Sequence, residues 1–224
     1  MAPDGVGLHF GRVPFFAMSA GGLIAAPISE SAVAAFAEPP DIDNAVALLA
    51  TVPVDVVGVA FTSASYTLGL EGESALIARL AEQISGMPIT TTCSATVRAL
   101  RHLNAQQVAL VDPPWFGAEL NEKGRNYYSS SGFDVLFSSV CDLPKNQLSI
   151  NPTELYRWIR HNVPVACKAI IIGGNGFRSV GIIEALEEDS QQLVITANQA
   201  ILWDLLRVAH YMKPIQGYGR LLNT

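Results

Sequence analysis

Residues 88–111, PITTTCSATVRALRHLNAQQVALV, carry the pattern that decides the predicted fold. The segment starts with a short apolar run that ends in threonines, continues with apolar residues at helical spacing, and closes with a second apolar run. A strand, a helix and a strand in this order are typical of a parallel β-α-β unit, in which the helix crosses one face of the sheet.

The rest of the chain repeats this alternation, which favours an α/β fold with parallel sheets flanked by helices. The expected strands are residues 6–17, 54–61, 88–92, 107–112, 133–140, 169–173 and 193–197. The expected helices are residues 41–51, 74–84, 94–103, 118–129, 152–161, 180–187 and 199–210.

Two of these strand-helix segments look like copies of one unit, PITTTCSATVRALR (88–101) and LVITANQAILWDLLR (193–207). The matching positions are Thr91 with Thr196, Ala95 with Ala200 and Leu100 with Leu205. One interpretation is that any two β-α units resemble each other. The other is a duplicated half, which would place the loops AFTSAS (60–65) and IIGGNG (171–176) opposite each other across a cleft. Ligands bind beyond the carboxyl ends of strands in such sheets, so we expect the site at these loops.

Composition and charge exclude several classes of protein. The 224 residues carry a formal net charge of −6, and the 14 Lys and Arg are scattered singly, so we expect no nucleic-acid partner. Residues 13–37 are apolar, but Pro14, Pro27, Ser29 and Glu30 interrupt them well before the roughly 20 residues that a membrane span needs. We therefore expect a strand and a loop there, and no membrane partner.

The cysteines Cys93, Cys141 and Cys167 are odd in number and not closely spaced, which indicates free thiols in a cytoplasmic protein. Cys93 lies where a strand gives way to a helix, and a helix N-terminus can lower the pKa of a thiol enough to make it a nucleophile or a base. The alternative is an inert, buried side chain. Cys141 and Cys167 look structural, and the four histidines share no spacing typical of a metal site.

The two loops carry residue types that hold anions. Thr62, Ser63 and Ser65 follow a buried strand directly, where hydroxyls and backbone N–H groups can bind a carboxylate or merely cap a helix. The run of Gly173, Gly174 and Gly176 allows a tight turn and the close approach of a ligand. It does not match G-x-G-x-x-G, which argues against a dinucleotide cofactor.

Four segments together resemble arylmalonate decarboxylases and, next to them, maleate cis-trans isomerases of the aspartate/glutamate racemase superfamily. They are GVAFTSASYTLG (58–69), PITTTCSATVRALRHLNAQQVALV (88–111), IIIGGNGFRSVGIIEALE (170–187) and GYGRLL (217–222). The resemblance implies two pseudo-symmetric Rossmann-like lobes, residues 1–104 with 198–224 and residues 105–197. It implies no cofactor and no metal, and it leaves a homodimer open.

In these families the chemistry rests on cysteines at two matching strand ends, where this chain has Phe61 and Gly174. Neither side chain can accept a proton or attack a double bond. What the resemblance carries over is a set of hydrogen-bond donors for a carboxylate, which we call the carboxylate site. Its expected members are Thr62, Ser63 and the backbone of Asn175 and Gly176.

The beginning of the chain also departs from the resemblance. These families open with a strand that ends in a polar or proline-rich loop, whereas MAPDGVGLHFGRVPFF (1–16) resembles their second strand with its lead-in. Either the first lobe lacks its first strand, or the coding sequence begins upstream of Met1. A missing central strand would leave buried amides without hydrogen-bond partners, and each such amide costs roughly 1–3 kcal/mol of stability. This cost favours a coding sequence that begins upstream of Met1.

Two functions fit these residues. The first is a cofactor-independent lyase or isomerase that acts next to the carboxylate of a small carboxylic or dicarboxylic acid, with Cys93, Tyr66 or Asp112 replacing the family's acid and base. The second is a non-catalytic member that only binds a small carboxylate. The missing cysteines favour the second function. The retained Thr62, Ser63 and glycine turn favour the first, which is the sequence-based prediction.

Overall fold

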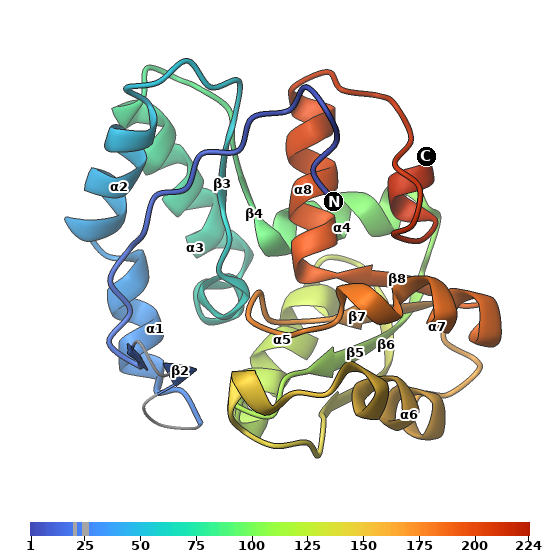
Figure 1. Cartoon of the computed structure of the whole chain (residues 1–224). Coiled ribbons are helices and arrows are strands. Elements are labelled where there is room, and N and C mark those ends of the chain that lie inside the picture. Colours follow the sequence, from blue (N-terminus) through green and yellow to red (C-terminus); the bar gives the residue numbers. More distant parts are fainter. Residues whose placement is uncertain (20–21, 24–26) are drawn as a thin grey trace.

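The computed structural model describes residues 1–19, 22–23 and 27–224 and shows an α/β chain with two lobes (Figure 1). Each lobe has a parallel sheet with helices packed against it, as the sequence predicts. The larger hydrophobic cluster extends from Ile28 to Leu222 and takes residues from both lobes. The lobes are therefore packed against each other and not merely joined by a linker.

The second lobe is built on a sheet of four parallel strands in the order β6-β5-β7-β8. Its strands are β5 (Gln107–Asp112), β6 (Asp134–Val140), β7 (Ala169–Ile172) and β8 (Leu193–Thr196). Its α-helices are α5 (Ala118–Ser130), α6 (Pro152–Asn162) and α7 (Ile183–Ser190). Two short 3-10 helices, η1 (Gln147–Ser149) and η2 (Val180–Ile182), lie between them. Every residue of β7 is buried, as expected for a strand covered on both faces. The chain leaves β5 toward β6 and returns on the other side of β5 as β7, and in such sheets ligands bind at the carboxyl ends of the strands where the order reverses.

The first lobe has a smaller sheet, in which β3 (Val57–Val59) pairs with β4 (Ile89–Thr91) in parallel. Its helices are α1 (Glu30–Ala37), α2 (Asp41–Leu49), α3 (Thr62–Gln83) and α4 (Thr92–His102). Val57 and Val59 point into a second hydrophobic cluster together with Leu76 and Leu80 of α3. This cluster holds the carboxyl-terminal segment of α3 against β3.

Helix α8 (Ala197–Val208) connects the lobes: it leaves β8 of the second sheet and runs beside α4 of the first lobe (Figure 1). Arg98 of α4 donates to both carboxylate oxygens of Asp204 in α8, and both donor–acceptor distances are 2.6 Å. The last turn, η3 (Leu221–Asn223), then packs against α8 and β8.

The two proposed copies have the same local structure. Thr91 caps α4 with Ser94, and Thr196 caps α8 with Gln199, each in a reciprocal capping box. Ala95 and Ala200 are fully buried one turn further on. The register seen in the sequence therefore corresponds to equivalent positions in two β-α units.

The structure corrects the start of α3. The sequence predicted a loop at residues 60–65 and a helix from residue 74, whereas the helix begins at Thr62 and bends at Gly69, which has φ +65°. Two helical segments thus follow each other without a loop. Glycine permits this backbone conformation at the bend, since it has no Cβ to clash.

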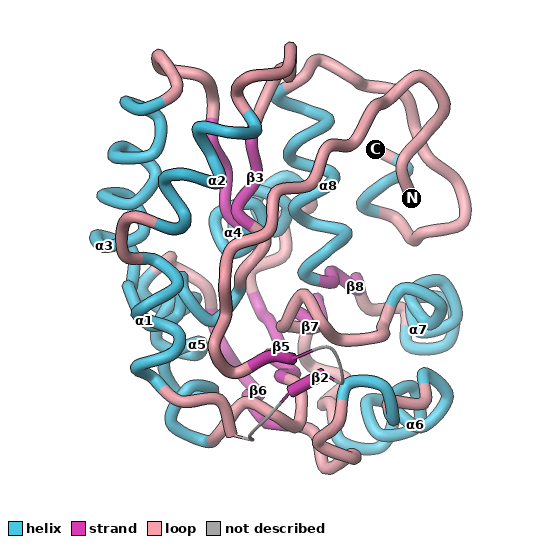
Figure 2. Tube along the Cα trace, turned by 60° about the vertical axis from the view of Figure 1, so that its left-hand side comes forward, coloured by secondary structure: helices cyan, strands magenta, loops and turns pink. Residues whose placement is uncertain are grey.

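The prediction of a strand over residues 6–17 is wrong. These residues run as an extended loop over the outside of the first lobe toward β1 (Met18–Ser19), which pairs with β2 (Gly22–Leu23) in a small antiparallel ribbon (Figure 2). Glycines at positions 5, 7 and 11 and prolines at positions 3 and 14 interrupt the apolar pattern, and proline cannot donate to a strand ladder.

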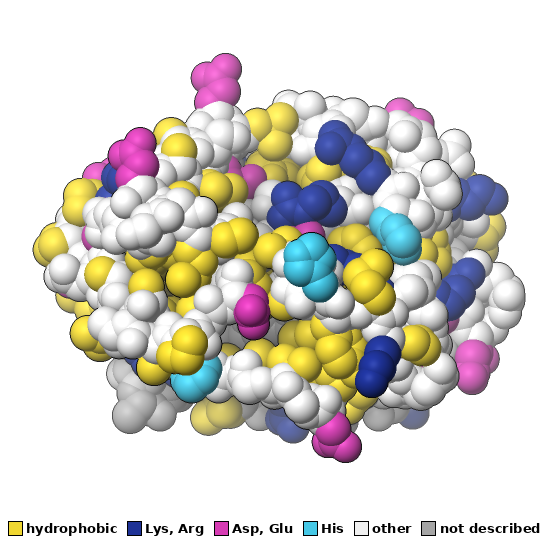
Figure 3. Space-filling view, turned by 90° about the horizontal axis from the view of Figure 1, so that it is seen from above, with side chains coloured by type: hydrophobic (Ala, Val, Ile, Leu, Met, Phe, Trp, Pro, Cys, Tyr) yellow, Lys and Arg dark blue, Asp and Glu magenta, His cyan; other side chains and the backbone are white. Residues whose placement is uncertain are grey.

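The prediction of a strand and loop over residues 13–37 missed helix α1, whose N-cap Ser29 accepts a bond from the Ala32 N–H at 3.2 Å. Residues 20–21 and 24–26 of that stretch lie outside the described residues. Among the described helices, none is long and apolar enough to cross a membrane. On the face seen from above, the Lys and Arg side chains form no continuous patch (Figure 3).

Candidate functional site

Polar side chains from both lobes meet where four strands end. Thr62 and Thr92 are the first residues of α3 and α4, the helices that follow the two strands of the first lobe. Asn175 follows β7, and Asn198 lies in the first turn of α8 after β8. We call these four residues the inter-lobe cluster.

Asn175 is the centre of the inter-lobe cluster. Its Oδ1 accepts bonds from the Thr62 N–H at 3.0 Å and the Thr62 hydroxyl at 2.9 Å. Its Nδ2 donates to Asn198 Oδ1 at 3.0 Å, while Asn198 Nδ2 donates to the Asn175 carbonyl at 2.9 Å. The Thr92 hydroxyl lies 3.2 Å from Oδ1 and 3.1 Å from Nδ2 of Asn175. The two predicted loops therefore face each other and are in direct contact.

The beginning of α3 has no cap of its own, because the N-cap position is Phe61. The Asn175 side chain supplies this cap from the other lobe by accepting the Thr62 N–H. Ser63 is 2% exposed, and no partner for its N–H or hydroxyl is found within the part of the chain that the structure describes. Donors beyond those used by Asn175 thus remain at this helix end.

The two positions aligned with the family cysteines are packed in different ways. The ring of Phe61 turns toward the N-terminal segment and α1, with ring centroids 4.9 Å from Phe15 and 4.0 Å from Phe36. Gly174 has φ +79°, and a Cβ added there would lie 2.7 Å from Pro113 Cγ. A larger residue at 174 would need both a strained backbone and a shift of Pro113.

A buried acid lies beside this glycine turn, at the carboxyl end of β5. Asp112 is fully buried, with Oδ1 3.3 Å from the Tyr66 hydroxyl and Oδ2 2.9 Å from Asn121 Nδ2. Burial raises the pKa of Asp112 to about 7, against the lowering effect of the bonds from Asn121 and Tyr66. A Cβ on Gly173 would be 2.1 Å from Asp112 Oδ1, so the close approach requires glycine.

Tyr66 and Cys93 are buried members of the larger hydrophobic cluster. Burial, followed by the neighbouring Asp112, raises the pKa of Tyr66 well above its ordinary value, so its hydroxyl acts as a donor. Cys93 is fully buried, 3.7 Å from the Thr62 carbonyl and 3.8 Å from the Tyr128 hydroxyl. Burial raises the pKa of the Cys93 thiol well above its ordinary value, and nearby Glu73 adds to this. Of the two interpretations of Cys93 drawn from the sequence, burial therefore favours the inert side chain.

Cys141 and Cys167 are also buried and unpaired. Burial raises the pKa of Cys141 to about 12 and raises that of Cys167 as well. In the described part of the chain, His, Cys, Asp and Glu side chains form no group of three that could hold a metal ion.

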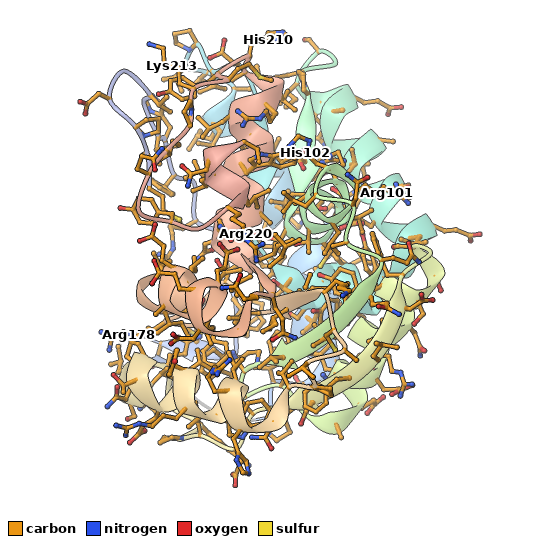
Figure 4. All side chains as sticks on the ribbon, turned by 90° about the vertical axis from the view of Figure 1, so that its right-hand side faces the viewer. Arg101, His102, Arg178, His210, Lys213 and Arg220 are labelled. Atoms are coloured by element: carbon orange, nitrogen blue, oxygen red, sulfur yellow. The ribbon has the colours of Figure 1, made fainter. Side chains whose placement is uncertain are left out.

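The inter-lobe cluster offers a ligand neutral donors and no charged side chain among its own four residues. Arg178 follows Asn175 closely in the sequence, but its side chain is exposed and lies at the edge of the molecule (Figure 4). The other labelled residues are spread over the same side: Arg101, His102, His210, Lys213 and Arg220. Recognition at the cluster would thus depend on hydrogen bonds.

The sequence predicted Thr62, the backbone of Asn175 and the glycine turn as site residues, but not Thr92, Asn198 or Asn121. The internal repeat contains the signal for two of these: both copies place a polar residue within two positions of the N-cap threonine, Thr92 after Thr91 and Asn198 after Thr196. Ser65, which the sequence grouped with Thr62, is buried near Cys93.

The two parallel sheets, whose strand ends meet between the lobes, define an α/β protein with a site at the carboxyl ends of its strands. The sequence profile described as arylmalonate decarboxylase matches residues 3–222, and the chain belongs to this family. No curated protein matches the chain.

Solved structures show the same fold. An arylmalonate decarboxylase structure has 21% identity and a TM-score of 0.73, over 87% of this chain and 84% of that one. The maleate isomerase Iso from Pseudomonas putida S16 has 24% identity and a TM-score of 0.80, over 88% of this chain and 80% of that one. A third structure is a cysteine-to-serine mutant of the Nocardia farcinica maleate cis-trans isomerase with a covalently bound succinylcysteine intermediate. It has 22% identity and a TM-score of 0.80, over 88% of this chain and 82% of that one.

Proposed function

We propose that the chain binds a small carboxylic or dicarboxylic acid between its lobes and acts, without a cofactor, at the carbon next to the carboxylate. The observation that carries this proposal is the meeting of Thr62 and Thr92 with Asn175 and Asn198 at four strand ends. Family membership supports it, because the related structures are decarboxylases and maleate isomerases.

The chemistry would develop negative charge on an enediolate-like state. Preorganised donors aimed at such a charge contribute several kcal/mol of transition-state stabilisation. Thr62 and Ser63 would supply these donors through their N–H groups and hydroxyls. These donors would thus replace part of the electrostatic stabilisation that a charged side chain would give.

The acid or base that stands in for the family cysteines is proposed to be the Tyr66–Asp112 pair. A group whose pKa is near 7 is present in both protonation states at neutral pH, which suits proton transfer. This pair lies against the backbone of the glycine turn, because a Cβ on Gly173 would meet both Asp112 Oδ1 and the Tyr66 hydroxyl. Cys93 stays a sequence-based candidate, but its raised pKa favours a structural role.

A second candidate is a non-catalytic protein that binds a small carboxylate. The residues at the two cysteine positions favour it, because Phe61 is held in an aromatic cluster and Gly174 cannot accept a larger side chain without strain. This candidate predicts binding without product.

The test is titration calorimetry with malonate, phenylmalonate and maleate, followed by NMR detection of products. We expect Thr62→Ala to weaken binding about tenfold or more, since it removes one donor of the site. The matched control is Thr153→Ala, an exposed threonine in the first turn of α6. Asp112→Asn should retain binding and lose turnover. Binding without product would support the second candidate, and absence of binding to all three acids would contradict both.

A further inference from the structure

The amide oxygen of Asn175 makes the contacts that one oxygen of a carboxylate would make. It accepts a backbone N–H and a hydroxyl from Thr62, and the Thr92 hydroxyl lies within reach. We infer that the Asn175 side chain is an internal occupant of the carboxylate site, and that a bound carboxylate takes its place. This inference rests on the proposed function and adds a competition between the chain and its ligand.

The orientation of both amides in the inter-lobe cluster is fixed by backbone groups. The Thr62 N–H can only donate, so it must face Oδ1 of Asn175. The Asn175 carbonyl can only accept, so it must face Nδ2 of Asn198, which leaves Asn198 Oδ1 for the Asn175 amide protons. An acceptor therefore occupies the donors of the first lobe, as a ligand would.

The Asn175 side chain can leave without unfolding its surroundings. The residue is half-buried, and its neighbours are Gly174, with φ +79°, and the exposed Gly176. Asn198 holds the Asn175 carbonyl, so the backbone stays anchored when the side chain rotates. Rotation would release the Thr62 N–H and the two threonine hydroxyls.

A carboxylate should compete well for these donors. Hydrogen bonds to an ionised acceptor are roughly twice as strong as those to a neutral amide. The unused N–H and hydroxyl of Ser63 lie next to Thr62 and add donors that the short Asn175 side chain leaves unpaired among the described residues. A bound acid would accept hydrogen bonds from both Thr62 and Ser63, whereas the Asn175 amide oxygen accepts none from Ser63.

The inference is tested by calorimetric titration of Asn175→Ala with sodium malonate and sodium maleate. Removal of the occupant should tighten binding about tenfold relative to the unmodified chain. Asn162→Ala, which removes an exposed asparagine at the end of α6, is the matched control and should leave the affinity unchanged. Unchanged or weaker binding by Asn175→Ala would overturn the inference, because Asn175 would then be neutral or a ligand of the acid.

A second readout uses the unmodified chain and is independent of how well the variant folds. Addition of malonate should speed hydrogen exchange of the Asn175 side-chain amide protons, since they leave Asn198 and Thr92 for solvent. Slower or unchanged exchange under saturating malonate would contradict displacement.

The outcomes separate the inference from the proposed function. Tight binding by the unmodified chain and loss of binding in Asn175→Ala would overturn only the inference. If only Asn175→Ala binds the acids, the inference is supported, and the proposal that the unmodified chain binds them is contradicted. Binding by neither protein would overturn both.

Discussion

Glycine is required at position 173 because two buried side chains approach its backbone closely. A Cβ at this position would lie 2.1 Å from Asp112 Oδ1 and 3.1 Å from the Tyr66 hydroxyl, both of which are buried. We expect Gly173→Ala to lower the free energy of unfolding by about 1–3 kcal/mol, the usual cost of overpacking a core. Urea denaturation measures this change. Gly181→Ala is the control, because a Cβ there meets nothing within 4 Å, and an equal loss in both variants would contradict the contact.

Asp112 makes stability depend on pH. Its pKa is about 7 in the folded chain and 3.8 ordinarily, so the folded chain binds this proton more tightly than the unfolded chain does. The stabilisation is full below about pH 4 and is lost as the pH rises through about 7. We expect the free energy of unfolding to fall over this window by up to about 4 kcal/mol.

Asp112→Asn should flatten that dependence, since the amide carries no proton to lose. The measurement is urea unfolding of both proteins at pH 5 and pH 8. If the two proteins lose the same stability between these pH values, Asp112 is not the group responsible.

At the scale of elements, α4 and α8 are tied together across the lobes by Arg98 and Asp204. Asp204 is 2% exposed, so Arg98→Leu leaves a buried carboxylate without its charged partner. We expect a loss of about 1.5–3 kcal/mol in the free energy of unfolding, because hydrogen bonds to charged groups contribute this much. The double variant Arg98→Leu with Asp204→Leu should recover part of it. A double variant that is less stable than Arg98→Leu alone would show that the pair is not the cause.

The sequence was sufficient to predict the bounds of elements that are marked by local apolar periodicity and capping residues. Strand β5 was predicted to the residue, and α5 and α6 to within one residue, because apolar periodicity and caps such as Asn151 mark their ends. The segment before residue 62 was predicted less well. Helix α1 is hidden in an apolar run, and the start of α3 looks like a loop because its cap is Asn175 from the other lobe.

The same distinction applies to the candidate site. Thr62 and the glycine turn were found from residue type and position after a strand. The role of Asn175 as an acceptor could not be found that way, since its partners Thr62 and Thr92 lie 113 and 83 positions away in the sequence. Long-range hydrogen bonds are properties of the packed lobes and leave no local pattern.

At the scale of the whole molecule, the two lobes share one large hydrophobic cluster, which holds their strand ends at a fixed separation. Tyr66 and Cys93 of the first lobe belong to this cluster together with β5 and β7 of the second. The inter-lobe cluster is therefore preorganised by packing on both sides. Small shifts between the lobes would break bonds to Asn175, so ligand binding and lobe packing are expected to be coupled.

A crystal structure of the chain soaked or grown with maleate is the most direct measurement of whether the two lobes together hold one small acid. We expect a carboxylate oxygen within about 3 Å of the Thr62 N–H and the Ser63 hydroxyl, in the usual range of hydrogen bonds, with the Asn175 side chain turned away. Maleate bound only at a site away from Thr62, with Asn175 still in place, would contradict it.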